Sequence, residues 1–317
     1  VYGLNDNGWG GAILGNYNTS AINCTFTNNY AEDNGGAINQ CSATDCIFTK
    51  NYSGCDGGAM DDGNATNCIF INNSAPEGAG GAFHFGIASS CIFINNSADM
   101  AGAVSYSNVS SCIFINNSAD GDAGAFTCGI ASSCIFINNF ARGDGGAMNW
   151  ECNAFNCTFI NNYARDCGGA IIEGNAFNCT FANNFAEECG GAMYFECNAF
   201  NCTFINNYAG ECGGAISEGN AFNCTFIINH ANDTGNHYDN LTTCINCTEI
   251  DSAILNVSNF TTIYRSGEKL PFSLTNATEI IKGAYTKITL LQNGRKYYAF
   301  TGQDLHVDLK IGAYDAR

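Results

Sequence analysis

Four glutamates, each six residues before a Cys-x-Phe motif, recur at a spacing that could bring their carboxylates together. They are Glu151, Glu173, Glu196 and Glu218. If the segments that carry them stack about 5 Å apart, their charges repel one another, and a bound Ca²⁺ would relieve that repulsion. The sequence holds no calcium-type nonapeptide repeat and no Asp-x-Asp-x-Asp-Gly loop. We therefore expect a solvated acidic stripe and no cofactor, with Ca²⁺ as the weaker alternative for this column.

A second, looser acidic column precedes the Gly-Gly pairs, so polysaccharide cleavage has to be weighed. Its members are Asp33, Asp56, Asp144, Asp166, Glu188 and Glu211. Lyases and hydrolases combine such acids with a base or with cations that neutralise a uronate. Only Arg142 and Arg165 come near this column, the four histidines share no register, and neither a Ser/His/Asp nor a His-Glu-x-x-His pattern occurs. A non-enzymatic protein is the preferred interpretation, and a polysaccharide lyase or hydrolase is the alternative.

The 20 cysteines divide into ten that mark a repeat and ten others. Among the others, Cys167, Cys189 and Cys212 share a register before Gly-Gly, and three residues in one column allow at most one disulfide among themselves. Cys244 and Cys247 form a single Cys-x-x-Cys, for which a capping role is favoured over zinc because no second pair accompanies it. These five residues are the disulfide candidates, and the repeat cysteines are expected to be buried thiols.

Glycosylation motifs are the strongest surface signal. Many Asn-x-Ser/Thr sequons follow from the repeat itself, so the better candidates are the irregular ones at Asn64, Asn108, Asn240, Asn256 and Asn276. Such acceptor sites indicate an extracellular compartment.

The elements that must position these residues come from a repeat of about 22 residues. Its cysteines stand at 24, 46, 68, 91, 112, 134, 157, 179, 202 and 224, each with Phe two places later and Asn three places after that, and Gly-Gly-Ala or a relaxed form leads each copy. This period is too short for helical hairpins and lacks a leucine pattern, so it predicts a parallel β-solenoid with one coil per repeat.

Strand alternation predicts where the side chains of each coil point. Cys and Phe should stack inward, and Asn29 and its equivalents should form an inward ladder of amides. The second glycine of each pair, such as Gly169, should occupy a bend with positive φ. The outward positions then hold eight isoleucines, which we expect to form an interface with another copy or another surface protein: Ile69, Ile71, Ile92, Ile94, Ile113, Ile115, Ile135 and Ile137.

Gly-Gly-Ala-Ile combined with Phe-x-x-Asn, as in residues 35–38 and 26–29, resembles the repeat of chlamydial polymorphic outer-membrane proteins. The fuller Asn-Cys-Thr-Phe-Ile-Asn-Asn-Tyr-Ala form is more similar to adhesin-like surface proteins of methanogenic archaea. The resemblance covers residues 1 to about 235 and implies a right-handed parallel β-helix on a cell surface. Residues 251–317 are similar to the Ig-like modules that follow such repeats in the archaeal proteins.

The expected organisation is a β-helix over residues 1–250 and an Ig-like β-sandwich module, incomplete in this chain, over residues 251–317. Net charge changes from −20 to +2 at this boundary, and alternation around Asn293-Gly294 predicts a β-hairpin in the second part. The second part is short for a sandwich, and the chain opens inside a coil. A fragment of a longer protein is favoured over a subunit that joins its neighbours end to end in a fibre.

The overall charge narrows the function further. A formal net charge of −18, with 11 basic residues, argues against nucleic acid or an anionic membrane as a partner, and no apolar run is long enough to span a bilayer. The sequence therefore predicts an extracellular, cell-surface glycoprotein: a structural or adhesive rod whose partners are copies of itself, other surface proteins or glycans.

Overall fold

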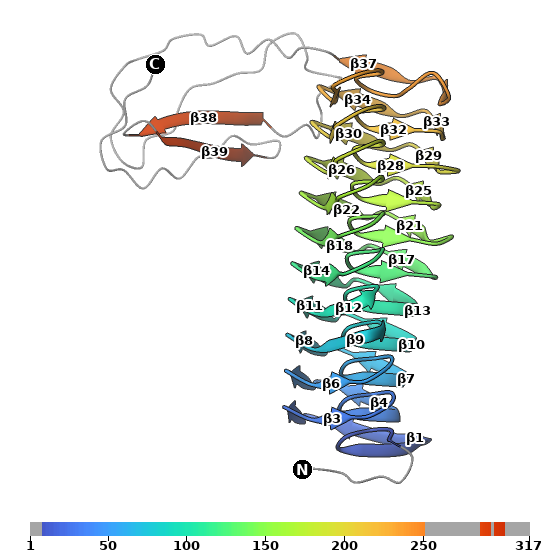
Figure 1. Cartoon of the computed structure of the whole chain (residues 1–317), viewed down its shortest axis with the longest axis vertical. Helices are drawn as coiled ribbons and strands as arrows, with labels where there is room; N and C mark the ends of the chain where they lie inside the picture. The colour runs from blue at the N-terminus through green and yellow to red at the C-terminus, as the bar shows by residue number, and fades with distance from the viewer. Residues whose placement is uncertain (1–7, 251–285, 293–294, 302–317) are drawn as a thin grey trace. The chain divides into compact units, whose positions relative to one another are not determined.

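The structure, a computed structural model, describes residues 8–250, 286–292 and 295–301 of the 317-residue chain. The chain divides into two compact units, Val1–Asp251 and Ser252–Arg317. Every regular element among the described residues is a β-strand (Figure 1). None of these residues belongs to a helix of the length and apolarity needed to cross a membrane.

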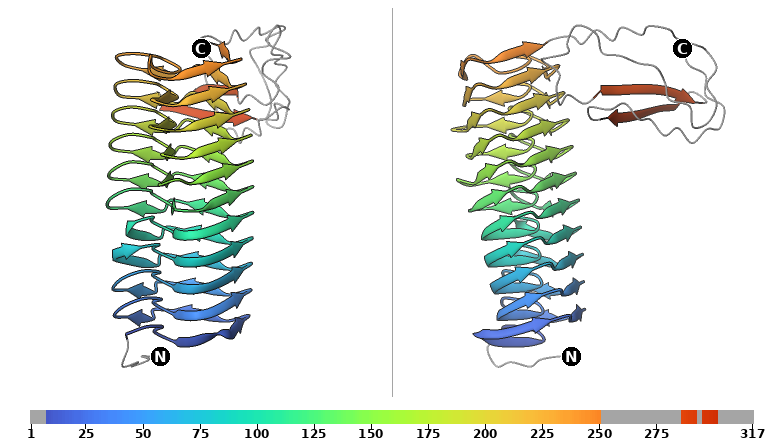
Figure 2. Two further views of the ribbon diagram at one scale, coloured as in Figure 1. Left: turned by 90° about the vertical axis from the view of Figure 1, so that its right-hand side faces the viewer. Right: turned by 180° about the vertical axis from the view of Figure 1, so that it is seen from behind.

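The first unit is a parallel β-solenoid in which successive coils stack strand on strand (Figures 1 and 2). Each coil contributes to three sheets that run the length of this unit. The second sheet holds the ten Cys-x-Phe strands and, after them, β37, where Glu249 takes the place of Phe. Its strands follow the order of the chain: β2 (Thr25–Thr27), β5 (Ile47–Thr49), β8 (Ile69–Ile71), β11 (Ile92–Ile94), β14 (Ile113–Ile115), β18 (Ile135–Ile137), β22 (Thr158–Ile160), β26 (Thr180–Ala182), β30 (Thr203–Ile205), β34 (Thr225–Ile227) and β37 (Thr248–Ile250).

The third sheet follows directly after each of these strands. Its members are β3 (Tyr30–Ala31), β6 (Tyr52–Ser53), β9 (Ser74–Ala79), β12 (Ser97–Met100), β15 (Ser118–Ala119), β19 (Phe140–Ala141), β23 (Tyr163–Ala164), β27 (Phe185–Ala186), β31 (Tyr208–Ala209) and β35 (His230–Ala231).

The first sheet follows each Gly-Gly pair, and its strands change form along the solenoid. Coils near the N-terminus have one long strand: β1 (Ile13–Ile22), β4 (Ile38–Thr44), β7 (Met60–Thr66), β10 (Phe83–Ser89) and β13 (Val104–Ser110). Later coils split this strand in two: β16 (Phe126–Thr127) and β17 (Ile130–Ser132), β20 (Met148–Asn149) and β21 (Asn153–Phe155), β24 (Ile171–Ile172) and β25 (Asn175–Phe177), β28 (Met193–Tyr194) and β29 (Asn198–Phe200), β32 (Ile216–Ser217) and β33 (Asn220–Phe222), and finally β36 (Thr243–Ile245) alone.

The corners beside the Cys-x-Phe strand explain why asparagine is so frequent. Asn201 and Asn206, which precede and follow β30, have φ of 53° and 51°. Asparagine adopts this left-handed conformation more readily than other side-chain-bearing residues. The two asparagines therefore turn the chain at both ends of the short strand, and the coil closes.

The interior is a column of stacked phenylalanines, as the alternation predicted. Neighbouring rings from Phe26 to Phe226 lie 4.6–5.0 Å apart and within 9° of parallel. Alanines and larger apolar side chains of the first sheet, such as Met60 and Phe83, fill the remaining space. The solenoid thus buries at least one large ring in each of these coils, and the rings of the column stack on those of neighbouring coils.

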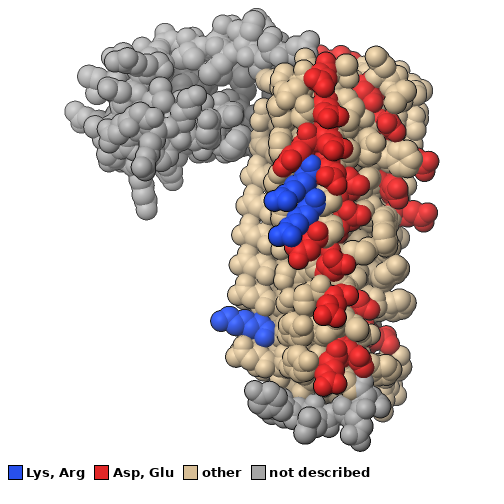
Figure 3. Space-filling view, in the orientation of Figure 1, with Lys and Arg blue, Asp and Glu red and all other residues tan. Residues whose placement is uncertain are grey.

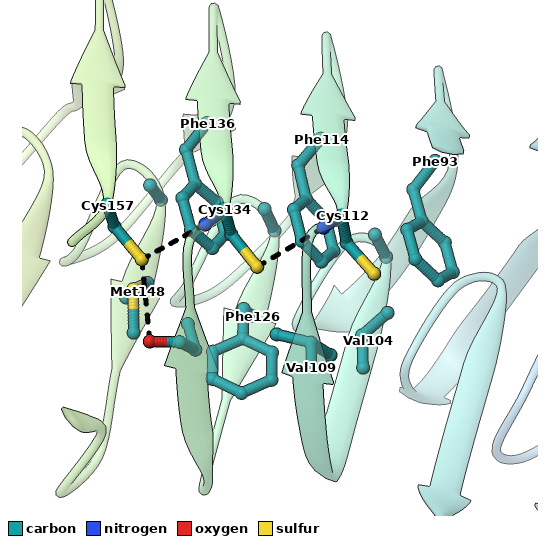
Figure 4. Close-up of a cluster of buried hydrophobic side chains, with 14 of the residues drawn as sticks. Phe93, Val104, Val109, Cys112, Phe114, Phe126, Cys134, Phe136, Met148 and Cys157 are labelled. Carbon is teal, nitrogen blue, oxygen red and sulfur yellow. Dashed lines mark hydrogen bonds between the residues drawn. The ribbon is translucent and has the colours of Figure 1, made fainter. Parts of the chain in front are cut away.

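Beside the rings, the repeat cysteines form a second column (Figure 4). The Cys112 N–H donates to Cys134 Sγ and the Cys134 N–H donates to Cys157 Sγ, both at 3.4 Å, while Cys157 Sγ donates to the Ala131 carbonyl. All ten repeat cysteines are free thiols, and nine of them are buried. A thiol suits this position because it can both donate to a carbonyl and accept from an amide.

The predicted asparagine ladder is also confirmed. Its members are Asn29, Asn51, Asn73, Asn96, Asn117, Asn139, Asn162, Asn184, Asn207 and Asn229. Each side-chain amide from Asn29 to Asn207 donates to the Oδ1 of the next member at 2.7–3.0 Å. Buried amides are stable only when they are paired, and here each coil satisfies the next.

The prediction for the second glycine of each pair is wrong. The positive φ belongs to the first glycine, as at Gly168 with φ of +65°, whereas Gly169 does not adopt a left-handed conformation. A Cβ on Gly169 would meet the carbonyl oxygen of Gly191, and it would lie 2.6 Å from the Phe185 carbonyl carbon. The second glycine is therefore required by close packing of backbone between coils, which a sequence does not reveal.

In the second unit, β38 (Thr286–Gln292) and β39 (Arg295–Thr301) pair antiparallel, with Gln292 opposite Arg295. This antiparallel pairing confirms the predicted hairpin. The other strands expected of an Ig-like module lie outside the described residues, as do the two chain ends on which the fragment and fibre predictions depend.

Candidate functional site

One or two positions per coil in the first sheet carry an outward side chain on a left-handed backbone. The members are Gln40, Asp62, Phe85, Tyr106, Cys128, Trp150, Glu151, Glu173, Phe195, Glu196 and Glu218, with φ between 47° and 63°. The conformation arises where the strand bends or divides, as between β16 and β17. We call this set the outer column.

The structure stacks the four predicted glutamates in consecutive coils of the outer column. The residues two places after them pair in register from Asn153 to Asn220, and the Glu196 N–H donates to the Glu218 carbonyl at 3.0 Å. Glu151 and Glu196 are exposed, whereas Glu173 and Glu218 are half-buried. Within the described part of the chain, no group of three or more His, Cys, Asp and Glu side chains is arranged to hold a metal ion.

The sequence reasoning missed an aromatic-walled groove at the start of this glutamate series. Tyr106, Cys128, Gly129, Trp150, Glu151 and Glu173 line a groove of about 590 Å³, which we call the Trp150 groove. Tyr106 and Trp150 are 48% and 38% exposed. The sequence held one sign of this groove. The repeat from Cys134 to Cys157 is 23 residues long, and its additional residue places Trp150 directly before Glu151.

A second hollow of about 380 Å³ continues the Trp150 groove toward the N-terminus. Phe85, Gly86, Ile87, Tyr106, Ser107, Asn108 and Cys128 line it, so Tyr106 and Cys128 belong to both. The Phe85 ring is 55% exposed and stacks on Tyr106 with centroids 6.5 Å apart. Burial raises the pKa of the Cys128 thiol. This thiol is therefore held in its neutral form, a poor nucleophile.

A half-buried histidine paired with a buried aspartate lies beside these rings, although the sequence showed no shared histidine register. His84 Nδ1 lies 2.6 Å from Asp61 Oδ1, and Asn39 Nδ2 donates to Asp61 Oδ2 at 2.7 Å. Burial lowers the pKa of His84, but the hydrogen bond and charge of Asp61 outweigh it and raise the pKa overall. Ser105 follows His84 in register, yet its Oγ is fully buried without a partner. The arrangement is a structural ion pair rather than a serine nucleophile.

The second acidic column contains one strongly perturbed carboxyl. Burial, together with the nearby Asp122, Asp166 and Glu188, raises the pKa of Asp144 to about 6, although its Oδ1 accepts a hydrogen bond from the Cys167 N–H at 2.8 Å. Figure 3 shows acidic side chains running as a stripe along the solenoid, with few basic ones among them.

The two arginines near this stripe have other partners. Arg142 Nε lies 3.3 Å from Asp120 Oδ1, with both side chains exposed, and the Arg165 guanidinium lies 5.9 Å from the Phe140 ring centre. Neither arginine lines the Trp150 groove.

The eight predicted isoleucines point away from the core on four adjacent strands, β8, β11, β14 and β18. They pair in register, Ile69 with Ile92, Ile113 and Ile135, and Ile71 with Ile94, Ile115 and Ile137. Ile135 is 37% exposed and the other seven are half-buried. We call these residues the Ile face.

Of the disulfide candidates, the structure joins Cys189 to Cys212 and Cys244 to Cys247. Cys167 remains a buried free thiol, and its Sγ lies 3.7 Å from Glu188 Oε2. Of the glycosylation candidates, Asn64, Asn108 and Asn240 are exposed. Asn256 and Asn276 lie outside the described residues.

Comparison with known proteins gives one family. The Chlamydia polymorphic membrane protein repeat matches residues 23–39, 156–171 and 201–217. No curated protein matches the chain in sequence. The matched segments each hold a Cys-x-Phe strand, its ladder asparagine and the Gly-Gly-Ala that follows, so the chain is similar to that family in the residues that build the coil.

Proposed function

We propose that this protein is an extracellular, cell-surface rod with a structural or adhesive role and no catalytic activity. The observation that carries the proposal is the uninterrupted stacking of coils whose repeat matches that of a membrane-protein family. Rings, thiols and amides each continue from coil to coil without a long irregular loop. Right-handed winding, glycosylation, an Ig-like second unit and kinship with archaeal adhesin-like proteins belong to the same proposal.

The chemistry of the Trp150 groove supports a binding role over an enzymatic one. Its two carboxylates, Glu151 and Glu173, could serve as acid and base, but no histidine, lysine or arginine lines the groove. Uronate cleavage needs a cation to neutralise the substrate, and acid–base hydrolysis needs one carboxyl with a distinct protonation state. The carboxyl of Asp144, whose pKa is raised to about 6, belongs to the other acidic column and does not line the groove.

Surface exposure and catalysis can be tested separately on the full chain. Antibody labelling and protease treatment of intact source cells should detect the protein outside the cell, and detection only after lysis would contradict the proposal. Incubation of the purified chain with neutral and uronate polysaccharides should release no reducing or unsaturated ends. Steady turnover, abolished by Glu151→Gln, would establish the enzyme alternative instead.

The Ile face is proposed to join two copies of the rod side by side. Eight aliphatic side chains stand in register, and the turn residues beside them, such as Asn67 and Asn72, are uncharged. A second copy offers the same flat, regular surface, so isoleucines could pack against isoleucines without burying a charge.

Sedimentation equilibrium tests this interface. Ile92→Lys with Ile94→Lys should convert a dimer to a monomer, because two charges would be buried in the apolar contact. Thr180→Lys is the matched control, since it occupies an outward position of the same sheet away from the Ile face. A parent chain that stays monomeric at tens of micromolar, or equal effects of both variants, would rule the interface out.

A further inference from the structure

The aromatic residues of the outer column are strained without being buried. Phe85, Tyr106, Trp150 and Phe195 have φ of 59°, 47°, 63° and 51°, a conformation that glycine adopts without cost. Each is at least 36% exposed. These exposed side chains make fewer packing contacts than core residues do, so such contacts do not compensate for the unfavourable backbone conformation. Strained, exposed side chains concentrate at binding sites, because a ligand can supply the missing contacts.

Tyr106 and Trp150 stand two coils apart, with the small residues Cys128 and Gly129 between them. The coil spacing puts the two aromatic positions about 9–10 Å apart along the solenoid. The groove that these residues line is wide enough along the solenoid for a ring-sized group beside the two aromatic residues. A groove of about 590 Å³ is also within the usual range for small-ligand sites. The continuing hollow beside Phe85 extends the surface past one ring, which suits an oligomer.

The polar groups of the groove restrict the chemistry of its occupant. Glu151 and Glu173 present carboxylate oxygens, which are strong acceptors for hydroxyl groups. An anionic ligand would meet these carboxylates and a net charge of −20 over residues 1–250, with no cation lining the groove. Aromatic faces together with hydrogen-bond acceptors match a molecule that has apolar C–H faces and hydroxyl edges. We infer that the Trp150 groove binds a neutral polysaccharide, with sugar rings packed on Trp150 and Tyr106 and hydroxyl groups donating to Glu151 and Glu173.

This inference specifies the ligand for the adhesive role proposed above. It rests on that proposed function only for the role of the binding in the cell. Trp9 and Trp150 are the only tryptophans of the chain, so Trp9→Phe leaves Trp150 as the sole tryptophan reporter. The full-length Trp9→Phe chain is titrated with soluble β-glucan, mannan and galactan oligosaccharides, and with polygalacturonate and chitosan oligosaccharides. We expect a saturable change in Trp150 emission with at least one neutral oligosaccharide and none with polygalacturonate. Tighter binding of the anionic or the cationic polymer would overturn the assignment of a neutral ligand.

Variants in the column separate binding from folding. Trp150→Asn and Tyr106→Asn remove the rings, while asparagine keeps the left-handed backbone, so both proteins should fold. Their affinity for the neutral oligosaccharide, measured by calorimetry, should fall about fivefold to tenfold, as expected for loss of one aromatic contact. Glu151→Gln should weaken binding because a neutral amide oxygen is a poorer acceptor.

Phe195→Asn is the matched control, because it has the same backbone conformation and lies outside the groove. Its affinity should equal that of the parent. Equal losses in Phe195→Asn and Trp150→Asn, or no binding to any neutral oligosaccharide, would overturn the inference. Either result leaves the proposed surface function intact, because labelling of intact cells tests that function independently.

Discussion

Replacing Asn139 by alanine tests whether the amide ladder stabilises the solenoid. Asn139 is fully buried, and its Oδ1 accepts hydrogen bonds from the backbone N–H and the Nδ2 of Asn117, both at 3.0 Å. Its own Nδ2 donates to Asn162 Oδ1 at 2.9 Å and to the Phe114 carbonyl at 3.2 Å. Asn162 Oδ1 would still accept from the Asn139 backbone, but the Asn117 backbone N–H would lose its acceptor, and Asn117 Nδ2 would keep only its bond to the Phe93 carbonyl.

The expected loss follows from those two donors. A buried donor left without a partner costs about 1–3 kcal/mol and the loss of one bond by a donor that keeps another costs about 1 kcal/mol, so Asn139→Ala should lower the free energy of unfolding by about 2–4 kcal/mol. Asn29→Ala is the control at the N-terminal end of the ladder. It removes the bond from Asn29 Nδ2 to Asn51 Oδ1, which keeps the bond from the Asn29 backbone. The expected loss there is about 1 kcal/mol.

Urea unfolding followed by far-ultraviolet circular dichroism measures both variants against the parent. The free energy is compared only where a single transition with an unchanged denaturant slope is seen, because a solenoid can lose coils from one end. If Asn139→Ala costs less than about 1 kcal/mol, or no more than Asn29→Ala, the amides are not the stabilising element that the buried contacts indicate.

Three further predictions concern other columns. Asp144→Asn should raise the free energy of unfolding at pH 7 by about 1 kcal/mol, a value reduced by the partial exposure of the side chain. The pKa of Asp144 is raised to about 6 in the folded chain, so the stability that its protonated form contributes below about pH 4 is lost as pH rises through 6. If the free energy of unfolding of the variant and of the parent change in parallel between pH 4 and 7, this prediction is wrong. Gly169→Ala should cost about 3 kcal/mol in urea unfolding through its clash with neighbouring backbone, whereas Gly121→Ala, where the nearest atom is 3.2 Å from the added Cβ, should cost under about 1 kcal/mol. Phe114→Ala should lower the thermal midpoint and cost about 3–5 kcal/mol, since its fully buried ring stacks on those of both neighbouring coils; a midpoint equal to that of the parent would show that the rings do not carry the core.

The inward half of each coil could be predicted from the sequence because the same residue types recur there. Equivalents of Phe48, Cys46 and Asn51 recur in ten coils at nearly constant spacing, and the close packing of a solenoid interior restricts substitution at these positions. The spacing within each such column gives the length of the repeat, and its residue type indicates that the position faces the interior.

The outer column could not be predicted in the same way, because its members differ in type from coil to coil. Tyr106, Cys128 and Trp150 share a place in the structure but no chemical property that a repeat search would align. The Asp61–His84 pair was hidden for a related reason, since the two residues are one coil apart and belong to different residue types. Only the observed register of the strands brings them together.

The glutamates of the outer column belong to a two-coil sequence unit that occurs twice in the chain. Two coil types alternate here: one holds an aromatic residue, Glu and Cys, as at Trp150 to Cys152, and the next holds Glu and Gly, as at Glu173 and Gly174. The pair is then repeated from Phe195 onward, with Asn-Ala-Phe-Asn-Cys-Thr-Phe in all four coils. Gene duplication of this two-coil unit would lengthen the protein without disturbing any interior contact, because each new coil meets neighbours of the same kind. Every such duplication would also add an outward aromatic residue beside a glutamate, as at Phe195 and Glu196, so the surface pattern of the rod would be copied together with its interior.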